Sequence, residues 1–423
     1  MKPLILFFVF LLTVFQSAGQ DGFNYDESKV PQFKLTDPLV FPGGRKVRSV
    51  KSWERRRKPQ IFNLFEDQMF GKIPAGLKIT HFRVLEESTE TPYKNAKRKQ
   101  VEMILEKEGK ELRILMLIYL PVNVPSAPVF LGYNFHGNHS VTTDVEVKIS
   151  ESWCNNNPSL GIINNQLTEQ SRGVESGRWP IQMILDAGYG VATIFYGDVD
   201  PDRDDFTDGV HPFAYRENQS RPLPNEWGSI AAWAWGLSQA MNYLEKDPGV
   251  DPSRVILIGH SRLGKTALWA GAIDSRFAMI ISNDSGCGGA ALSRRKFGET
   301  VKRINTSFPH WYCTNFKAYN DNEENLPFDQ HELIALLAPR PVYIASAQED
   351  LWADPRGEYL SGFYATPVYH LFGKNGLESP VPPSVNQPVM NQIGYHIRTG
   401  KHDITEYDWT QYIQFADRHL LKK

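Results

Sequence analysis

Short apolar segments recur along the chain, and helical patterns separate them. Between residues 228–245 and 265–273 the apolar residues follow a helical spacing. The later apolar segments are continuous rather than alternating, so both faces of their strands must be covered, which predicts a mostly parallel sheet between two helical layers. The segments of strand length, most of them bounded by Gly, Pro or Asp, are residues 111–120, 129–135, 190–196, 254–258, 277–282, 341–345 and 367–372.

Long loops follow several of these predicted strands, over residues 136–180, 198–226, 285–335 and 374–401. In a parallel sheet, the loops at the carboxyl ends of the strands are where binding and catalytic sites are built. We therefore expect a single α/β domain over residues 20–423, a three-layer sandwich with its functional site in these loops.

The first residues of the chain have the pattern of a secretory signal peptide. Lys2 precedes an apolar run over residues 4–15, and the small residues Ser17, Ala18 and Gly19 follow it. The run is too short to span a bilayer comfortably, and no cysteine follows it as a lipid attachment point. This predicts a signal peptide over residues 1–19 and a secreted or periplasmic mature protein without a membrane anchor.

Charge and cysteine content exclude several classes of partner. The chain has 46 basic and 48 acidic residues, so no overall field favours nucleic acid or an anionic membrane. Cys154, Cys287 and Cys313 permit at most one internal disulfide, and buried free thiols are an equally open reading. Neither H-E-x-x-H nor a pair of C-x-x-C motifs is present, so we expect no metal and no cofactor. We expect a monomer.

The stretch GHSRLGKT, from Gly259 to Thr266, admits two chemical interpretations. As G-x-x-x-x-G-K-[ST] it is a phosphate-binding P-loop, in which Lys265 and Thr266 reach phosphate and magnesium. As a strand, a sharp turn and a helix it presents Ser261 as a nucleophile. Arg and Leu inside the loop, and the late position of the strand, favour the nucleophile. A serine that only caps the helix is the structural alternative.

The order of acids and histidine after Ser261 favours the nucleophile further. Asp284 and Asp350 close the next two predicted strands, and His402 follows in TGKHDITEYDW. Hydrolases of the α/β class place nucleophile, acid and histidine in this order along the chain. Either acid is able to orient the imidazole of His402, and the residues alone do not decide between them.

Three further residues have possible roles near the reacting atoms. Arg262, beside the nucleophile, is able to place a fixed cation near the oxyanion, although a salt bridge at the start of a helix is the plainer reading. His136, in NFHGNHS, resembles the histidine-glycine loop that supplies an oxyanion amide in esterases, or packs structurally. His396 is the fallback for His402 as the base.

At these residues the chain resembles a known family, the glucuronoyl esterases of carbohydrate esterase family 15. The resemblance rests on GHSRLGK, NDSGCGGA, INTSFPHWYCTNF, EDLWADPRGEYL and GKHD, which cover most of the mature chain in order and look closest to bacterial members. It implies an α/β-hydrolase fold and a serine esterase that cleaves the ester between 4-O-methyl-glucuronic acid of glucuronoxylan and lignin alcohols.

The resemblance also implies particular site residues. In the family, the catalytic acid is usually a Glu at the position of Asp284. Some bacterial members use an acid that maps to Asp350. The family segment slightly favours Asp284, whereas general hydrolase topology favours Asp350. In fungal members, two cysteines beside the serine and the histidine form a disulfide. His260 and Asp403 occupy those two positions here, so that disulfide is absent.

For the sugar, the resemblance points to four residues. Lys265 lies one helical turn after the nucleophile, on the same face, where it is able to donate to hydroxyls. Trp352 is suited to stack on the uronate or donate through its indole N–H. Glu299 accepts from hydroxyls, and His310 lines the same pocket or belongs to the core.

Other functions stay open at this stage. A xylan or other carbohydrate acetyl esterase on the same fold would use the same triad without needing Lys265, Glu299 and Trp352 around a bulky uronate. A secreted, non-catalytic carbohydrate-binding protein with this fold is an alternative from another class. A nucleotide-binding P-loop protein is the third alternative.

Overall fold

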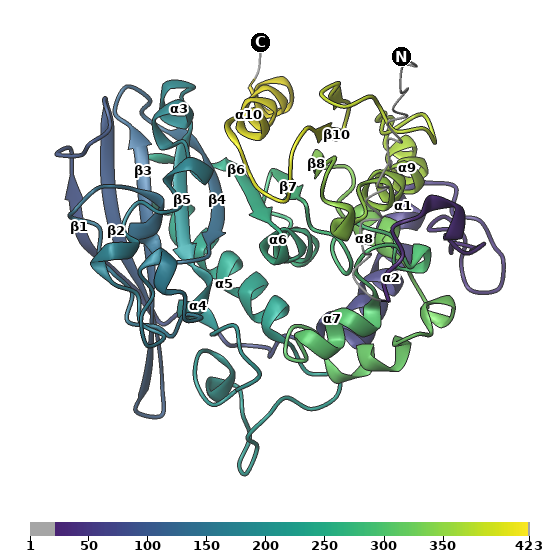
Figure 1. The fold of residues 1–423 in the computed structure, drawn as a ribbon, viewed down its shortest axis with the longest axis horizontal. Helices are drawn as coiled ribbons and strands as arrows, with labels where there is room; N and C mark the ends of the chain where they lie inside the picture. Colours follow the sequence, from purple (N-terminus) through teal and green to yellow (C-terminus); the bar gives the residue numbers. More distant parts are fainter. Residues whose placement is uncertain (1–21, 422–423) are drawn as a thin grey trace, which may run out of the picture.

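One mixed sheet of ten strands organises the part of the chain that the computed structural model describes, residues 22–421 (Figure 1). Its strand order is β1-β2-β3-β5-β4-β6-β7-β8-β10-β9. The strands are β1 (His81–Ser88), β2 (Ala96–Lys107), β3 (Lys110–Pro121), β4 (Ala127–Asn134), β5 (Gly190–Phe195), β6 (Val250–His260), β7 (Met279–Asn283), β8 (Val342–Ala347), β9 (Val389–Met390) and β10 (Ile393–Arg398).

The centre of the sheet is parallel, and its first three strands form an antiparallel edge. Strands β1, β2 and β3 pair antiparallel with one another, and β3 pairs antiparallel with β5. From β5 through β4, β6, β7 and β8 to β10 every pairing is parallel. All residues of β4, β5, β7 and β8 are buried, which explains why these strands are continuously apolar. The mostly parallel α/β sheet predicted from the sequence is confirmed.

Helices cover both faces of the sheet. Helices α3 and α10 pack against one face, and α5, α6, α8 and α9 against the other; in Figure 1, α10 lies above the central strands and α6 below them. The helices are α1 (Val50–Ser52), α2 (Lys58–Phe65), α3 (Ile181–Asp186), α4 (Tyr196–Val199), α5 (Ser229–Leu244), α6 (Arg262–Ile273), α7 (Val301–Ser307), α8 (Gln330–Leu336), α9 (Pro355–Leu371) and α10 (Glu406–Leu420).

Two parts of the strand prediction are corrected by the structure. Residues 367–372 are not a strand: they end helix α9, which contains Pro367. Val368 and Tyr369 are buried there, and a short buried apolar run has the same sequence signature in a helix as in a strand. The strand that precedes His402 is β10, whose GYHIR sequence was assigned to a loop because its buried positions include His396 and Arg398.

Two further predictions concern the cysteines and the membrane. Cys154, Cys287 and Cys313 are all buried and free. Within residues 22–421, no helix has the length and apolar character needed to cross a bilayer. The predicted signal peptide, residues 1–19, lies outside the described residues.

The connection from β6 to α6 is a tight turn at the carboxyl end of the sheet. Strand β6 ends at His260 and helix α6 begins at Arg262, so Ser261 is the only residue between them. Gly259 makes this possible: a Cβ there would lie 2.0 Å from the carbonyl oxygen of Leu263. Only a residue without a side chain allows the helix to come this close to the strand.

We expect Gly259→Ala to lower the free energy of unfolding by about 1–3 kcal/mol, because the backbone of α6 has to move away from β6. Urea denaturation measures the change. Gly177→Ala is the matched control, since an added Cβ there would meet nothing within 4 Å. Equal stability of the two variants would contradict the tight-turn account.

Candidate active site

Ser261 is held in a strained backbone conformation at the turn between β6 and α6. Its φ is 58° and its ψ is −129°, outside the regions that residues with a side chain usually occupy. This is the geometry of a nucleophile elbow, which presents a serine hydroxyl at the carboxyl edge of the sheet. The next amide, that of Arg262, is the first of helix α6, so it has no partner within the helix and is suited to bind an oxyanion.

The P-loop interpretation of the same stretch is wrong. A phosphate-binding loop needs the backbone before Lys265 to wrap an anion, but residues 262–264 already belong to helix α6. The Lys265 ammonium points away from such a site, because it donates to the carbonyl oxygens of Ser285 and Cys287, each at 2.6 Å.

His402 and Asp350 form the acid-base pair beside this elbow. The Nδ1 atom of His402 lies 2.6 Å from Oδ2 of Asp350, which follows β8 and is buried. The His402 side chain is 40 % exposed, and its ring lies against that of His260, with 4.5 Å between the ring centroids. Because His260 immediately precedes Ser261, this contact places the imidazole of His402 near Ser261. Asp350 is therefore positioned to orient the imidazole.

Asp284 lies in the same cluster but does not hydrogen-bond the imidazole. Single ligand atoms of Asp284, Asp350 and His402 all lie within 4.8 Å of one another. The Oδ2 atom of Asp284 accepts a hydrogen bond from the amide of Asp403, at 3.3 Å, and its Oδ1 is buried without a partner. Burial, reinforced by the charges of Glu358 and Asp350, raises the pKa of Asp284 well above its usual value. Asp284 thus fastens the loop that carries the histidine.

Asp202 is the centre of a second polar group, around Arg262. Its Oδ2 accepts from Nη1 of Arg262 at 2.9 Å and from the Tyr196 hydroxyl at 3.0 Å. Its Oδ1 accepts from the Trp311 indole at 2.7 Å and lies 2.8 Å from Nε2 of His310. Burial alone would raise the pKa of Asp202, but the charge of Arg262 and the hydrogen bonds outweigh it and lower the pKa to about 2.

Asp202, which joins Arg262 and His310, was not predicted from the sequence, although both of these partners were. The available signal was its place in the long loop after β5, at the carboxyl edge of the sheet. Nothing local in that acidic loop, which also contains Asp204, Asp205 and Asp208, distinguished it from its neighbours.

Lys265, Glu299 and Trp352 are brought together by the loops around α6. The Nζ atom of Lys265 lies 3.6 Å from Oε2 of Glu299, and both side chains are buried. The amide of Glu299 donates to the carbonyl oxygen of Trp352 at 3.0 Å. Burial raises the pKa of Glu299, and the nearby Lys265 charge opposes that rise. Lys265 is more deeply enclosed than a freely reaching sugar ligand would be.

The two other histidines that were candidates from the sequence, His396 and His136, have different surroundings. His396 is buried in β10, where its Nε2 lies 2.8 Å from Oδ1 of Asp408 and its Nδ1 lies 3.0 Å from the Tyr343 hydroxyl. Burial lowers the pKa of His396. These contacts belong to the packing of α10 against the sheet, so His396 is not placed to serve as the base.

His136 lies between two cavities at the carboxyl edge of the sheet. One, of about 320 Å³, is also lined by Arg262 and Asp202. The other, of about 450 Å³, is lined by Arg178 and Asp403, whose side chains form an ion pair at 2.6 Å. One cavity thus reaches the residue after the nucleophile, and the other reaches the residue after the base.

The fold and this arrangement define the class of the protein. A strained serine at a strand-to-helix turn, a buried acid paired with a histidine beside it, and a cation next to the oxyanion position are the parts of a carboxylic ester hydrolase with the α/β-hydrolase fold.

Comparison with known proteins gives the family. A family model described as glucuronyl esterase of fungi matches residues 215–373. Carbohydrate esterase MZ0003 from an unknown prokaryotic organism is 51 % identical over 410 residues, which cover 94 % of this chain and 92 % of that protein. The chain belongs to carbohydrate esterase family 15.

Solved structures agree with this assignment. The structure of a promiscuous esterase of this family from a marine bacterial metagenome is 51 % identical, with a TM-score of 0.87 over 94 % of this chain and 100 % of that one. A glucuronoyl esterase from Solibacter usitatus is 44 % identical, with a TM-score of 0.88 over 93 % of this chain and 100 % of that one. The family resemblance and the fold predicted from the sequence are confirmed.

Replacing the two acids separately distinguishes their roles. We expect Asp350→Asn to lower kcat by about four orders of magnitude, because the amide no longer holds the imidazole in the productive tautomer. Asp284→Asn should lower kcat by no more than about tenfold, since a carboxyl with a raised pKa resembles an amide in charge. Steady-state kinetics on one ester measures both; a larger loss in Asp284→Asn would assign the acid role to Asp284.

Neutralising Asp202 should impair catalysis and remove an acid-sensitive contribution to stability. With its pKa lowered from 3.8 to about 2, Asp202 stabilises the fold above pH 4, and that contribution is lost as the pH falls towards 2. We expect Asp202→Asn to lose this pH dependence of the Tm and to lower kcat by about 10- to 100-fold through Arg262.

Thermal melts from pH 2 to 6, together with kinetics at neutral pH, measure the two effects. Glu217→Gln, at an exposed position of the same loop, is the control and should behave like the wild-type protein. An unchanged kcat in Asp202→Asn would mean that Arg262 acts without its carboxylate partner.

Proposed function

We propose that this protein is a secreted serine esterase that cleaves the ester between (4-O-methyl-)glucuronic acid of glucuronoxylan and lignin alcohols. The observation that carries the proposal is the 2.6 Å pairing of His402 with Asp350 beside the strained Ser261. Membership of family 15, together with a glucuronoyl esterase 44 % identical over nearly the whole chain, supports the substrate class. The apolar run over residues 4–15 supports export.

The proposed reaction follows from these positions. His402 takes the proton of the Ser261 hydroxyl, and the alkoxide attacks the uronate carbonyl carbon. The Arg262 amide and guanidinium stabilise the oxyanion, while Asp350 stabilises the charged imidazole. His402 then protonates the departing alcohol, leaving glucuronate esterified to Ser261. Water, activated by the same histidine, releases glucuronate.

A uronate ester suits this site because the reacting carbonyl belongs to the sugar itself. Contacts to the ring therefore position the carbonyl directly against the nucleophile. Glu299, held by Lys265 at 3.6 Å next to helix α6, supplies an acceptor, and Trp352 adds a partly exposed aromatic surface. His310 holds the Asp202 group that anchors Arg262. A small acetyl group would engage neither Glu299 nor Trp352.

Activity on other carbohydrate esters is the second candidate. The 51 % identical family member is described as promiscuous, which favours testing an acetyl ester beside the uronate ester. The triad chemistry is the same for both substrates, so only the rates on matched substrates separate them.

We expect the mature protein to hydrolyse benzyl glucuronate faster than an acetyl ester of comparable reactivity. Ser261→Ala should abolish both activities, because no other residue supplies the nucleophile. Lys265→Ala should reduce uronate hydrolysis far more than acetyl hydrolysis, because the acetyl group does not reach the Lys265–Glu299 pair. Initial rates by chromatography of the released alcohol measure all three.

The remaining outcomes separate the alternatives. Preference for the acetyl ester would make the protein a carbohydrate acetyl esterase. Binding of glucuronoxylan without turnover, unchanged in Ser261→Ala, would make it a carbohydrate-binding protein.

A further inference from the structure

The first described residues of the chain run along the loops that carry Glu299 and Trp352. We call residues 23–34 the N-terminal strap. We infer that this strap is a specificity-determining part of the substrate site, which fixes Trp352 and Glu299 and extends the aromatic surface of Trp352 with Phe23. This inference rests on the proposed uronate esterase function.

The strap begins with an aromatic pair. The ring of Phe23 meets that of Trp352 edge to face, with 4.9 Å between centroids and 76° between ring planes. The guanidinium of Arg303 lies 5.7 Å from the centroid of Phe23. Phe23 and Trp352 are both only partly buried, so the pair presents an apolar surface to solvent of the kind on which sugar rings stack.

The next residue of the strap is joined to the backbone beside Glu299. The carbonyl oxygen of Asn24 accepts a hydrogen bond from the amide of Gly298 at 2.8 Å. Gly298 has a φ of +62°, and a Cβ there would lie 2.4 Å from the carbonyl oxygen of Trp352. Glu299 in turn donates its amide to that oxygen at 3.0 Å. Strap, Glu299 and Trp352 therefore form one closely packed unit without room for a side chain at position 298.

An ion-pair chain fixes the middle of the strap to the same two loops. Oε1 of Glu27 lies 2.6 Å from Nη2 of Arg295, and Nε of that arginine lies 2.8 Å from Oδ2 of Asp354. Glu27 also reaches Arg356 at 3.3 Å. Asp354 follows Trp352 by two residues, while Arg295 precedes Glu299 by four. Because Arg295 and Asp354 are buried, this pairing is shielded from solvent.

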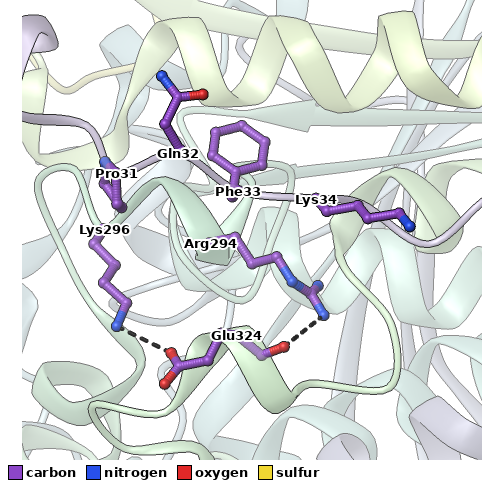
Figure 2. Close-up of a pocket in the computed structure, with 7 residues that line it drawn as sticks. All are labelled: Pro31, Gln32, Phe33, Lys34, Arg294, Lys296 and Glu324. Carbon is purple, nitrogen blue, oxygen red and sulfur yellow. Dashed lines mark hydrogen bonds and ion pairs between the residues drawn. The ribbon is translucent and has the colours of Figure 1, made fainter.

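The end of the strap leaves the site over a separate cavity. Figure 2 shows Pro31 to Lys34 crossing above Arg294, Lys296 and Glu324. Lys296 pairs with Glu323 at 2.9 Å, and Arg294 pairs with Asp329 at 3.3 Å. Since both cations have acidic partners, we assign no ligand to this cavity and regard it as the place where the strap departs from the loop.

The distribution of these anchors favours a role in substrate specificity. The strap contacts two segments, residues 295–303 and 352–356, through Phe23, Asn24 and Glu27. These segments contain the two residues proposed to contact the sugar, Glu299 and Trp352. Residues 26–29 of the strap are exposed. Loosening the strap should therefore move Glu299 and Trp352 while leaving the Ser261–His402–Asp350 group in place.

The test compares two substrates in Phe23→Ala. We expect KM for benzyl glucuronate to rise about three- to tenfold, the effect of losing one aromatic pair, with kcat near the wild-type value. Hydrolysis of 4-nitrophenyl acetate, which has no sugar, should be unchanged. Phe23→Tyr should restore the KM, because its ring makes the same edge contact. Lys29→Ala is the matched control within the strap, since its side chain is 74 % exposed.

Three other outcomes of this test would lead to different conclusions. An unchanged KM in Phe23→Ala, with uronate hydrolysis intact in the wild-type protein, would overturn the role of the strap alone. An equal loss on both substrates accompanied by a lower Tm would reduce the strap to a structural element. Absence of uronate hydrolysis in the wild-type protein would instead refute the proposed function on which the inference rests.

Discussion

The tight connection between β6 and α6 is the constraint on which the site depends. With only Ser261 between strand and helix, the serine takes a positive φ, and Gly259 has to be free of a side chain so that Leu263 can approach. The same turn places the first amides of α6 and Arg262 directly after Ser261, where the proposed mechanism needs donors for the oxyanion. It also places His260 against the ring of His402, which brings a loop from the far end of the sequence to the nucleophile.

Two carboxylates, the buried Asp350 and the largely enclosed Asp202, lie on either side of this turn. Asp350 faces the imidazole of His402, and in the proposed mechanism its negative charge stabilises the positive charge that the imidazole gains. Asp202 faces Arg262 and joins it to Tyr196, His310 and Trp311, so the guanidinium proposed to stabilise the oxyanion is held in place by the protein itself. Such preorganised charge acts strongly because little water is present to reorganise around it.

Much of this arrangement was predictable from the sequence, for identifiable reasons. The elbow and the order Ser261, acid, His402 are local or sequential patterns, and parallel strands bring their carboxyl ends together. The choice of Asp350 over Asp284 was not predictable, because it depends on side-chain directions a few ångströms apart. Asp202 was missed because three of its partners, Arg262, His310 and Trp311, are 60 or more positions away in the chain. Strand β10 was missed because it buries His396 and Arg398, which pair with Asp408 rather than with solvent.

In the proposed mechanism, Ser261 carries the glucuronoyl group during turnover. Rapid acid quenching of the wild-type protein with benzyl glucuronate, followed by peptide mass spectrometry, tests this step. We expect a mass increase equal to the ester less benzyl alcohol on the peptide that contains Ser261, and none in Ser261→Ala. Release of benzyl alcohol with the adduct on another residue would contradict it.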